Sequence, residues 1–212
     1  MAKNKSVKTT GISKYLKWFW GLFIGGIILA ILPFYFASLG VLGYMPTFED
    51  LENPEKDLAS EVISIDGKTL GKYAVENRTP VKFKEIPENL VNALVATEDE
   101  RFFQHSGIDY KSTTRAILKL GKGGGGSTLT QQLAKQLFHG EGSTNFVSRI
   151  FQKVKEYVIS ARLERQYTKK EIITMYLNQY DFLNLAVGIR SATRIYFGKE
   201  PPELDQEESA ML

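Results

Sequence analysis

The chain has 212 residues, a formal net charge of +3 and no cysteine, and its 43% of hydrophobic residues is ordinary for a globular protein. This length allows a membrane anchor plus one domain with its own core, and so small a net charge gives no reason to expect a nucleic acid as partner. The lack of cysteine excludes disulfides, a thiol nucleophile and a lipidated cysteine anchor.

The N-terminus combines basic residues with a long apolar segment. Five lysines precede an uncharged run from Trp18 to Met45. A membrane span needs ~20 apolar residues, so this run predicts one transmembrane helix. Lysines on the N-terminal side predict a cytoplasmic N-terminus, with the rest of the chain outside. The alternative is a cleaved signal peptide, but its apolar region is usually only about 7–15 residues long, which favours an uncleaved signal anchor.

The remaining chain has one β-rich segment followed by helical patterns. Asp66-Gly67 lies between two β-rich runs in residues 61–83, which predicts a small hairpin. A capping box at Thr168–Glu171, and a second of the same form at Asp205–Glu208, mark two helix starts. Apolar spacing predicts a first helix that begins at residue 87 and ends between 98 and 103. Further helices are predicted over residues 109–120, 129–138, 146–166 and 168–178, and from 205 onward.

The longest predicted helix, residues 146–166, has a stripe of apolar residues that we expect to face inward. The stripe consists of Val147, Ile150, Phe151, Val154, Val158 and Ala161.

An acidic cluster lies at the end of the first helix that follows the hairpin. Glu98-Asp99-Glu100 leads into Phe102 and Phe103. Three acids in a row at a helix end are commonly a solvated surface, which is a purely structural interpretation. The functional interpretation places one carboxylate in a cleft, where the two phenylalanines form an apolar wall that raises its pKa into the range of a general base. The residue pattern leaves both open.

A glycine-flanked polar segment, Gly125 to Gln136, precedes and enters the next apolar helix. Its short donors and acceptors suit a sugar or a phosphate, and backbone N–H groups at a helix start favour an anion. No Gly-Lys-Ser/Thr closes the pattern, so it is not a phosphate loop of the nucleotide-binding kind. Lys135, one turn into the helix, is placed to reach the same anion.

A third group lies on the long predicted helix. Arg149, Lys153 and Glu156 are spaced four and three apart, so they line one face. The structural interpretation is an exposed helix with an ordinary ion pair, and the functional one is a charged wall of a site.

These segments together resemble a known family. Glu98–Gly107 and Gly125–Gln136 resemble the first two motifs of glycosyltransferase family 51, the peptidoglycan polymerase domain of class A penicillin-binding proteins. Gln152–Glu156 and Lys170–Asn178 are similar to the third and fourth motifs, and the resemblance covers roughly residues 60–212. The chain departs from the family pattern at Gln136, at Gln152 and in the segment 179–185, and Arg149 lies about one residue from the usual arginine.

The resemblance implies a fold class and an organisation. We expect a mainly α, lysozyme-like glycosyltransferase domain with a small β-hairpin, preceded by one N-terminal transmembrane helix. Residues 1–17 would be a cytoplasmic basic tail, 18–45 a transmembrane signal anchor, and 46–212 the glycosyltransferase domain, incomplete at its C-terminus. The expected location is the bacterial cytoplasmic membrane, with the catalytic domain outside.

The resemblance also implies an activity: polymerisation of lipid II into β-1,4-linked glycan strands with inversion and release of undecaprenyl diphosphate. Glu98 falls on the catalytic glutamate, the general base, and Glu156 on the second acidic residue of the site. His105 is expected as a hydrogen-bond partner rather than as a base. The expected substrate-binding residues are Asp99, Phe102, His105, Ser127, Thr128, Thr130, Gln131, Gln132, Lys135, Arg149 and Lys153.

Cofactors, partners and rival functions follow from the same comparison. Glu156 would orient the basic groups or bind a divalent cation, Mg²⁺ or Mn²⁺, and no organic cofactor is expected. The expected partners are lipid II, the growing glycan chain, the membrane and other cell-wall synthesis proteins. One rival is a lysozyme-like muramidase or lytic transglycosylase, which needs no diphosphate-binding cations. Another is a non-catalytic membrane-anchored cell-wall binding module, in which Glu98 and Glu156 would be dispensable.

Overall fold

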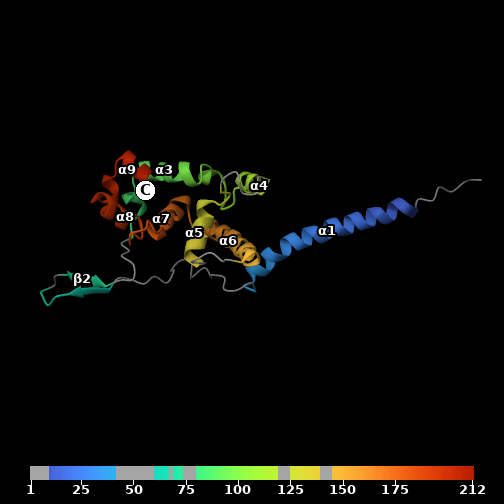
Figure 1. Cartoon of the computed structure of the whole chain (residues 1–212), viewed down its shortest axis with the longest axis horizontal. Coiled ribbons are helices and arrows are strands. Elements are labelled where there is room, and N and C mark those ends of the chain that lie inside the picture. Colours follow the sequence, from blue (N-terminus) through green and yellow to red (C-terminus); the bar gives the residue numbers. More distant parts are fainter. Residues whose placement is uncertain (1–9, 42–59, 67–68, 74–79, 119–124, 139–144) are drawn as a thin grey trace, which may run out of the picture. The chain divides into compact units, whose positions relative to one another are not determined.

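The computed structural model of the chain describes residues 10–41, 60–66, 69–73, 80–118, 125–138 and 145–212 (Figure 1). The chain divides into two compact units, Met1–Met45 and Pro46–Leu212.

The described residues of the first unit, 10–41, contain helix α1 (Thr10–Ser38). Its segment Ser13–Ser38 is long and apolar enough to cross a membrane. Apolar side chains such as Leu22 and Leu29 are more than 70% exposed, as expected for a helix whose natural surroundings are lipid. The helix begins before Trp18 and ends at Ser38, so it ends earlier than the predicted span; residues 42–45 lie outside the described part of the chain.

The predicted hairpin is confirmed. Strand β1 (Ser60–Ile63) pairs antiparallel with β2 (Thr69–Tyr73), with Ser60 opposite Tyr73 and an irregular register between Val62 and Ile63. Gly67 of the predicted turn lies outside the described residues.

The rest of the second unit that the structure describes is mainly helical, which confirms the mainly α prediction. Its α-helices are α3 (Glu88–Glu98), α4 (Tyr110–Leu118), α5 (Leu129–Phe138), α6 (Phe146–Gln166), α7 (Lys169–Gln179), α8 (Ile189–Phe197) and α9 (Gln206–Met211). Three short 3₁₀ turns accompany them, at Phe83–Glu85, Phe102–Gln104 and Pro201–Glu203. Both predicted capping boxes are present, at the starts of α7 and α9.

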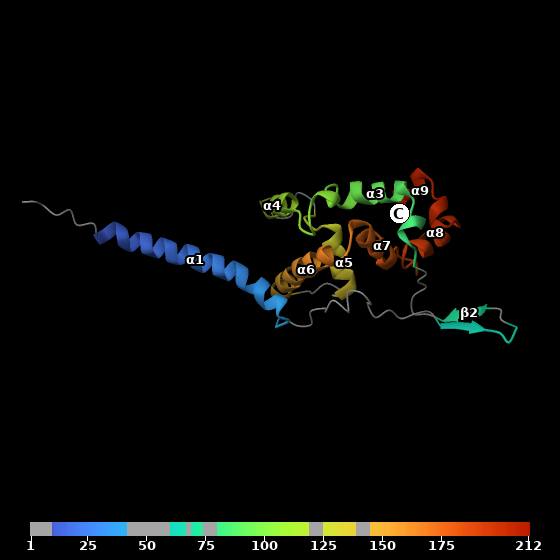
Figure 2. The same cartoon turned by 180° about the vertical axis from the view of Figure 1, so that it is seen from behind.

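The core forms around α5, which packs against both α6 and α7, while α3 packs against α9 (Figures 1 and 2). Side chains from the three central helices are fully buried, among them Leu133 of α5, Leu163 of α6 and Ile172 of α7. This packing fixes the directions in which the polar faces of α5 and α6 point.

The predicted inward stripe of α6 is only partly correct. Val154 is buried, but Val147, Ile150 and Phe151 are 61%, 47% and 39% exposed. Burial along the described helix begins at Val154 and continues through Ile159 and Leu163, and α6 packs against α5 and α7.

Candidate active site

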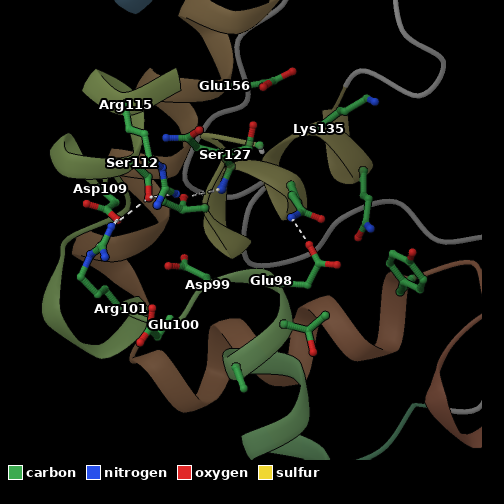
Figure 3. A pocket seen from close by; sticks show the side chains of 18 residues that line it. Glu98, Asp99, Glu100, Arg101, Asp109, Ser112, Arg115, Ser127, Lys135 and Glu156 are labelled. Carbon is green, nitrogen blue, oxygen red and sulfur yellow. Dashed lines mark hydrogen bonds and ion pairs between the residues drawn. The ribbon is translucent and has the colours of Figure 1, made fainter. Parts of the chain in front are cut away.

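A cavity of about 800 Å³ opens where the end of α3, the start of α4, the start of α5 and the middle of α6 meet (Figure 3). Its wall combines both signs of charge. The acids are Glu98, Asp99, Glu100, Asp109 and Glu156, and the cations are Arg101, Arg115 and Lys135. In Figure 3, Glu98 and Glu156 are well separated, with Ser127 between them. The structure therefore brings the two predicted catalytic acids and Lys135 into one cavity.

Glu98 is the last residue of α3, which ends because Asp99 takes a non-helical conformation with φ −155°. The Glu98 side chain is exposed, and its Oε2 accepts a hydrogen bond from Gln132 Nε2 at 2.7 Å. The expected apolar wall is wrong. Phe102 is fully buried and Phe103 is 58% exposed, and neither lines the cavity.

The 3₁₀ turn at Phe102–Gln104 explains why Phe102, which was predicted to bind substrate, does not line the cavity. The turn directs the Phe102 ring into the core, where it meets the imidazole of His105 and lies 4.2 Å from the Lys169 ammonium group. The Lys169 Nζ also donates to the His105 carbonyl oxygen at 2.6 Å, which holds the turn in place.

Asp99 connects the first motif to the start of α5. It is buried, and its carboxylate accepts hydrogen bonds from His105 Nε2 at 3.0 and 3.1 Å and from the Leu129 N–H at 3.1 Å. Since both partners of Nε2 are carboxylate oxygens, this nitrogen carries the proton. His105 does not line the cavity. The structure therefore agrees with His105 as a hydrogen-bond partner, and it places the side chain away from the cavity wall, which gives no support to a direct contact with substrate.

Seven of the twelve residues of the second motif line the cavity, namely Gly125, Ser127, Thr128, Gln131, Gln132, Lys135 and Gln136. The hydroxyl of Thr128 and the amide of Gln131 both donate to the Gly107 carbonyl oxygen, at 2.7 and 3.3 Å. Gly107 has φ +85°, and a Cβ there would lie 3.0 Å from the Ser160 carbonyl oxygen, so the position requires glycine.

Thr130 was predicted to bind substrate, but it faces the core. It is fully buried, and its hydroxyl donates to Glu164 Oε1 at 2.6 Å. The physical reason is helical periodicity: Thr130 lies three and four positions before the buried residues Leu133 and Ala134, so it shares their inward side of α5, and its hydrogen bond to Glu164 reaches α6.

The structure places Arg149, Lys153 and Glu156, the third group, in different surroundings, and of these three only Glu156 lines the cavity. Lys153 Nζ donates to Ser127 Oγ at 2.7 Å and to Glu156 Oε2 at 2.9 Å, so it joins the second and third motifs directly behind the cavity wall. Glu156 is buried and lines the cavity. Arg149 lies in the exposed first turns of α6 and is not part of the wall, so its predicted contact with substrate is not supported by this arrangement.

Among the wall residues that were not predicted, Arg101, Asp109, Ser112 and Arg115 form one hydrogen-bonded group. Arg101 donates to Asp109 Oδ2 and to Ser112 Oγ, and Arg115 donates to the same Ser112 oxygen at 3.2 Å. Burial raises the pKa of Asp109, but the hydrogen bonds from Arg101, Ser112 and nearby backbone N–H groups outweigh it and hold the pKa at about 2. Three of these residues were predictable from the sequence, because Asp109, Ser112 and Arg115 follow one another at three-residue spacing, which brings them to one face of a helix.

The cavity suits a substrate that is both polar and anionic. Glu98 offers a carboxylate next to free cavity volume, and Lys135 and Arg115 offer positive charge in the same space. Within the described ranges, no three acidic or histidine side chains converge into a metal centre. Glu156 supplies one carboxylate, and Mg²⁺ is commonly held by one or two carboxylates together with substrate phosphates. The residues therefore fit a metal ion only in combination with a phosphate-bearing substrate.

Comparison with known proteins identifies the domain. A family model described as Transglycosylase matches residues 66–212. Penicillin-binding protein 1A of Pseudomonas aeruginosa is 36% identical over 204 residues, which cover 94% of this chain and 24% of that protein. Penicillin-binding protein 1F of Bacillus subtilis is 39% identical over 201 residues, covering 90% of this chain and 27% of that protein.

A third relative, penicillin-binding protein 1A of Escherichia coli, is 30% identical over 203 residues. The chain spans about a quarter of the length of these curated relatives. The family match confirms the predicted lysozyme-like fold class. The chain therefore belongs to the transglycosylase family, glycosyltransferase family 51, and its homologues are class A penicillin-binding proteins.

Proposed function

We propose that this chain is a peptidoglycan glycosyltransferase that polymerises lipid II into β-1,4-linked glycan strands. The observation that carries the proposal is the single cavity whose wall combines Glu98 and Glu156 with Lys135 and Arg115. Joining two lipid-linked sugars requires a base for the attacking hydroxyl group and positive charge for the departing diphosphate, and this cavity offers both.

Glu98 is the proposed general base. The 4-hydroxyl oxygen of the incoming lipid II attacks C1 of the growing chain's reducing-end sugar, and its proton passes to the Glu98 carboxylate. A positioned base contributes about 10²- to 10⁴-fold to such a step. The C1–O bond to the diphosphate breaks on the opposite face, so the configuration at C1 inverts. This arrangement follows the logic of inverting glycoside chemistry, with a sugar hydroxyl in place of water.

The cations are assigned to the leaving group. Undecaprenyl diphosphate departs with the electron pair of the broken bond, and negative charge on its phosphate oxygens increases in the transition state. Lys135 is exposed at the wall, and Lys153 is held beside Ser127 by its hydrogen bonds. A divalent cation, when bound, would be held by Glu156 and the diphosphate together and would neutralise part of that charge.

The N-terminal helix is assigned to the membrane that carries the substrate. The lysines that precede the apolar segment favour a cytoplasmic N-terminus, which places the catalytic domain outside the bacterial cytoplasmic membrane. A lipid-linked substrate would then be supplied from the same bilayer in which α1 is anchored.

A product assay tests this function against its rivals. The purified anchored chain is incubated separately with lipid II and with finished glycan strands, and products are separated by size and analysed by mass. Polymer of increasing length together with released undecaprenyl diphosphate supports the proposal. Shortening of finished strands would identify a muramidase or lytic transglycosylase instead. Binding without any change in either substrate would identify a non-catalytic binding module.

A further inference from the structure

A hydroxyl group on α7 is linked to Glu98 through one intervening amide. Tyr176, a residue of α7, is buried, with 3% of its surface exposed. Its Oη donates a hydrogen bond to Gln132 Oε1 at 3.1 Å, and Gln132 Nε2 donates to Glu98 Oε2 at 2.7 Å. Helices α7, α5 and α3 therefore contribute one side chain each to a continuous hydrogen-bonded chain.

We propose that Tyr176 is a positioning residue for Glu98, because its hydroxyl group holds the Gln132 amide in the orientation that donates to one carboxylate oxygen and leaves the other to accept a proton. This inference deepens the proposed function and rests on it, since it concerns the group assigned as the base. Within the described part of the chain, the hydrogen bond to Glu98 reaches Oε2, so Oε1 is the oxygen assigned to the proton transfer.

The direction of the chain follows from which groups can donate. A glutamine amide has a donor end and an acceptor end, whereas an ionised carboxylate only accepts. If the Gln132 amide were reversed, its oxygen would face the carboxylate of Glu98 and the hydrogen bond would be lost. The Tyr176 proton is buried and needs an acceptor, and Gln132 Oε1 supplies it. Both ends of the amide are thus fixed by their partners.

The phenol remains a donor throughout the working pH range. Burial raises the pKa of Tyr176 well above its ordinary value, and the nearby charges of Glu98 and Tyr180 act in the same direction. The Tyr176 ring also packs against the Tyr180 ring, with 5.3 Å between the ring centroids, so the hydroxyl group is held by a rigid aromatic neighbour.

Other charges share the cavity and belong in any account of its pH dependence. The acids that share the cavity wall with Glu98 include Asp99, Glu100 and Glu156, and the exposed cations of the wall are Arg115 and Lys135. Arg101 and Asp109 face the same space as an ion pair. On the α9 side, the second cavity next to Glu98 is lined by Ser209 to Leu212, which carry no ionisable side chain. The Gln132 amide donates directly to the Glu98 carboxylate, with none of these groups between them. This hydrogen bond is therefore the contact that the Tyr176 hydroxyl group orients.

Loss of the hydroxyl group has a specific kinetic consequence. A hydrogen bond to the charged form of a carboxylate favours that form, so loss of the orienting hydroxyl group is expected to alter the pH dependence of the reaction. In Tyr176→Phe we expect the acidic limb of the pH–rate profile to move up by about half to one pH unit. We expect kcat on that limb to fall about three- to tenfold and KM for lipid II to stay within about twofold.

The control is Tyr196→Phe, which removes a hydroxyl group that donates at 2.6 Å to the Phe182 carbonyl oxygen and is not linked to Glu98. Its acidic limb is expected to stay in place. Circular dichroism verifies that Tyr176→Phe, which retains the packed ring, is folded.

A double-mutant comparison tests whether Tyr176 acts through Gln132. In Gln132→Met the intervening amide is absent, so adding Tyr176→Phe is expected to change the pH profile no further. The inference would be overturned if the acidic limb of the pH–rate profile in Tyr176→Phe stays where it is in the wild type. It would also be overturned if the losses in kcat of the two single variants multiply fully in the double variant. Because Gln132→Met supplies the second variant, the comparison does not depend on the behaviour of Tyr176→Phe alone.

The side-chain amide of Gln132 gives a readout that needs no turnover. Its ¹⁵N resonance, identified by its absence in Gln132→Met, is expected to shift as Glu98 titrates, and this shift is expected to vanish in Glu98→Gln. In Tyr176→Phe the two amide protons are expected to lose their separation in chemical shift. An amide spectrum identical in wild type and Tyr176→Phe would refute the inference even in an active enzyme. If the chain makes no polymer, the proposed function fails, and the same spectra still decide the role of Tyr176.

Discussion

Lys153 links the second and third motifs, so its removal tests the charge distribution of the site. The change is Lys153→Met, which retains most of the apolar stem and removes the ammonium group. In the wild type this group donates to Ser127 Oγ at 2.7 Å and to Glu156 Oε2 at 2.9 Å. The variant therefore loses one cation next to the proposed diphosphate position and leaves the Glu156 carboxylate without its cationic partner.

The stability and activity effects differ in size. The Lys153 side chain is 36% exposed and that of Glu156 is 8% exposed, so solvent screens part of the ion pair. We expect the free energy of unfolding to fall by about 1 kcal/mol, which corresponds to a melting temperature lower by about 2–4 °C. Removal of a group that stabilises developing negative charge typically costs about 2.7–4 kcal/mol in the transition state, or 10²- to 10³-fold in kcat. The expected loss of activity is therefore far larger than unfolding can explain.

The assay combines initial rates of lipid II polymerisation with thermal melts of the same preparations. Lys155→Met is the matched control, since it removes the same group two positions away on α6, where a side chain points to another face. A Lys153→Met variant that polymerises lipid II within about threefold of wild type would refute the assignment of Lys153 to the leaving group. A collapse of the melting temperature would instead show that Lys153 mainly supports the fold.

Three further predictions address other parts of the site. The folded-state pKa of Asp109 is about 2, below its ordinary value of 3.8. Its ion pair with Arg101 therefore stabilises the fold above about pH 4, and this stabilisation is lost as the pH falls toward 2. In thermal melts, Asp109→Asn should be less stable than wild type by up to about 2 kcal/mol at pH 5, and the difference should become smaller toward pH 2. Gly107→Ala should lower the melting temperature by several degrees, since φ +85° and the 3.0 Å approach to the Ser160 carbonyl oxygen leave no room for a Cβ; an unchanged melt would contradict this. Arg115→Met should lower kcat/KM for lipid II about tenfold or more with little change in melting temperature, because the exposed guanidinium lines the cavity, and an unchanged kcat/KM would remove Arg115 from the diphosphate site.

The parts of the structure that were predictable from sequence are those encoded within a few residues. Helix starts such as Thr168 and Asp205 carry their own capping partners three positions later, so they were placed correctly. Glu98 at the exit of its helix followed in the same way from local apolar spacing. The meeting of Glu98, Lys135 and Glu156 in one cavity was expected only from the family resemblance, since they lie on three different helices.

The parts that failed depend on tertiary contacts. Phe102 and Phe103 are adjacent and chemically identical, and only the 3₁₀ turn decides that the first is buried and the second exposed. The α6 stripe continues to Val147 in sequence, yet the described neighbours cover it only from Val154 onward. The link from Tyr176 to Glu98 joins residues far apart in the chain, and no local pattern predicts such a pairing.

The claim on which the account depends is that Glu98, rather than its acidic neighbours, accepts the proton. Glu98 and Glu100 line the same cavity, but the Gln132 amide orients only Glu98. The most direct measurement is the initial rate of lipid II polymerisation by Glu98→Gln and Glu100→Gln under identical conditions. We predict a loss of about 10³-fold in Glu98→Gln and a rate within severalfold of wild type in Glu100→Gln. A Glu98→Gln enzyme that still polymerises at a rate close to wild type would contradict the account.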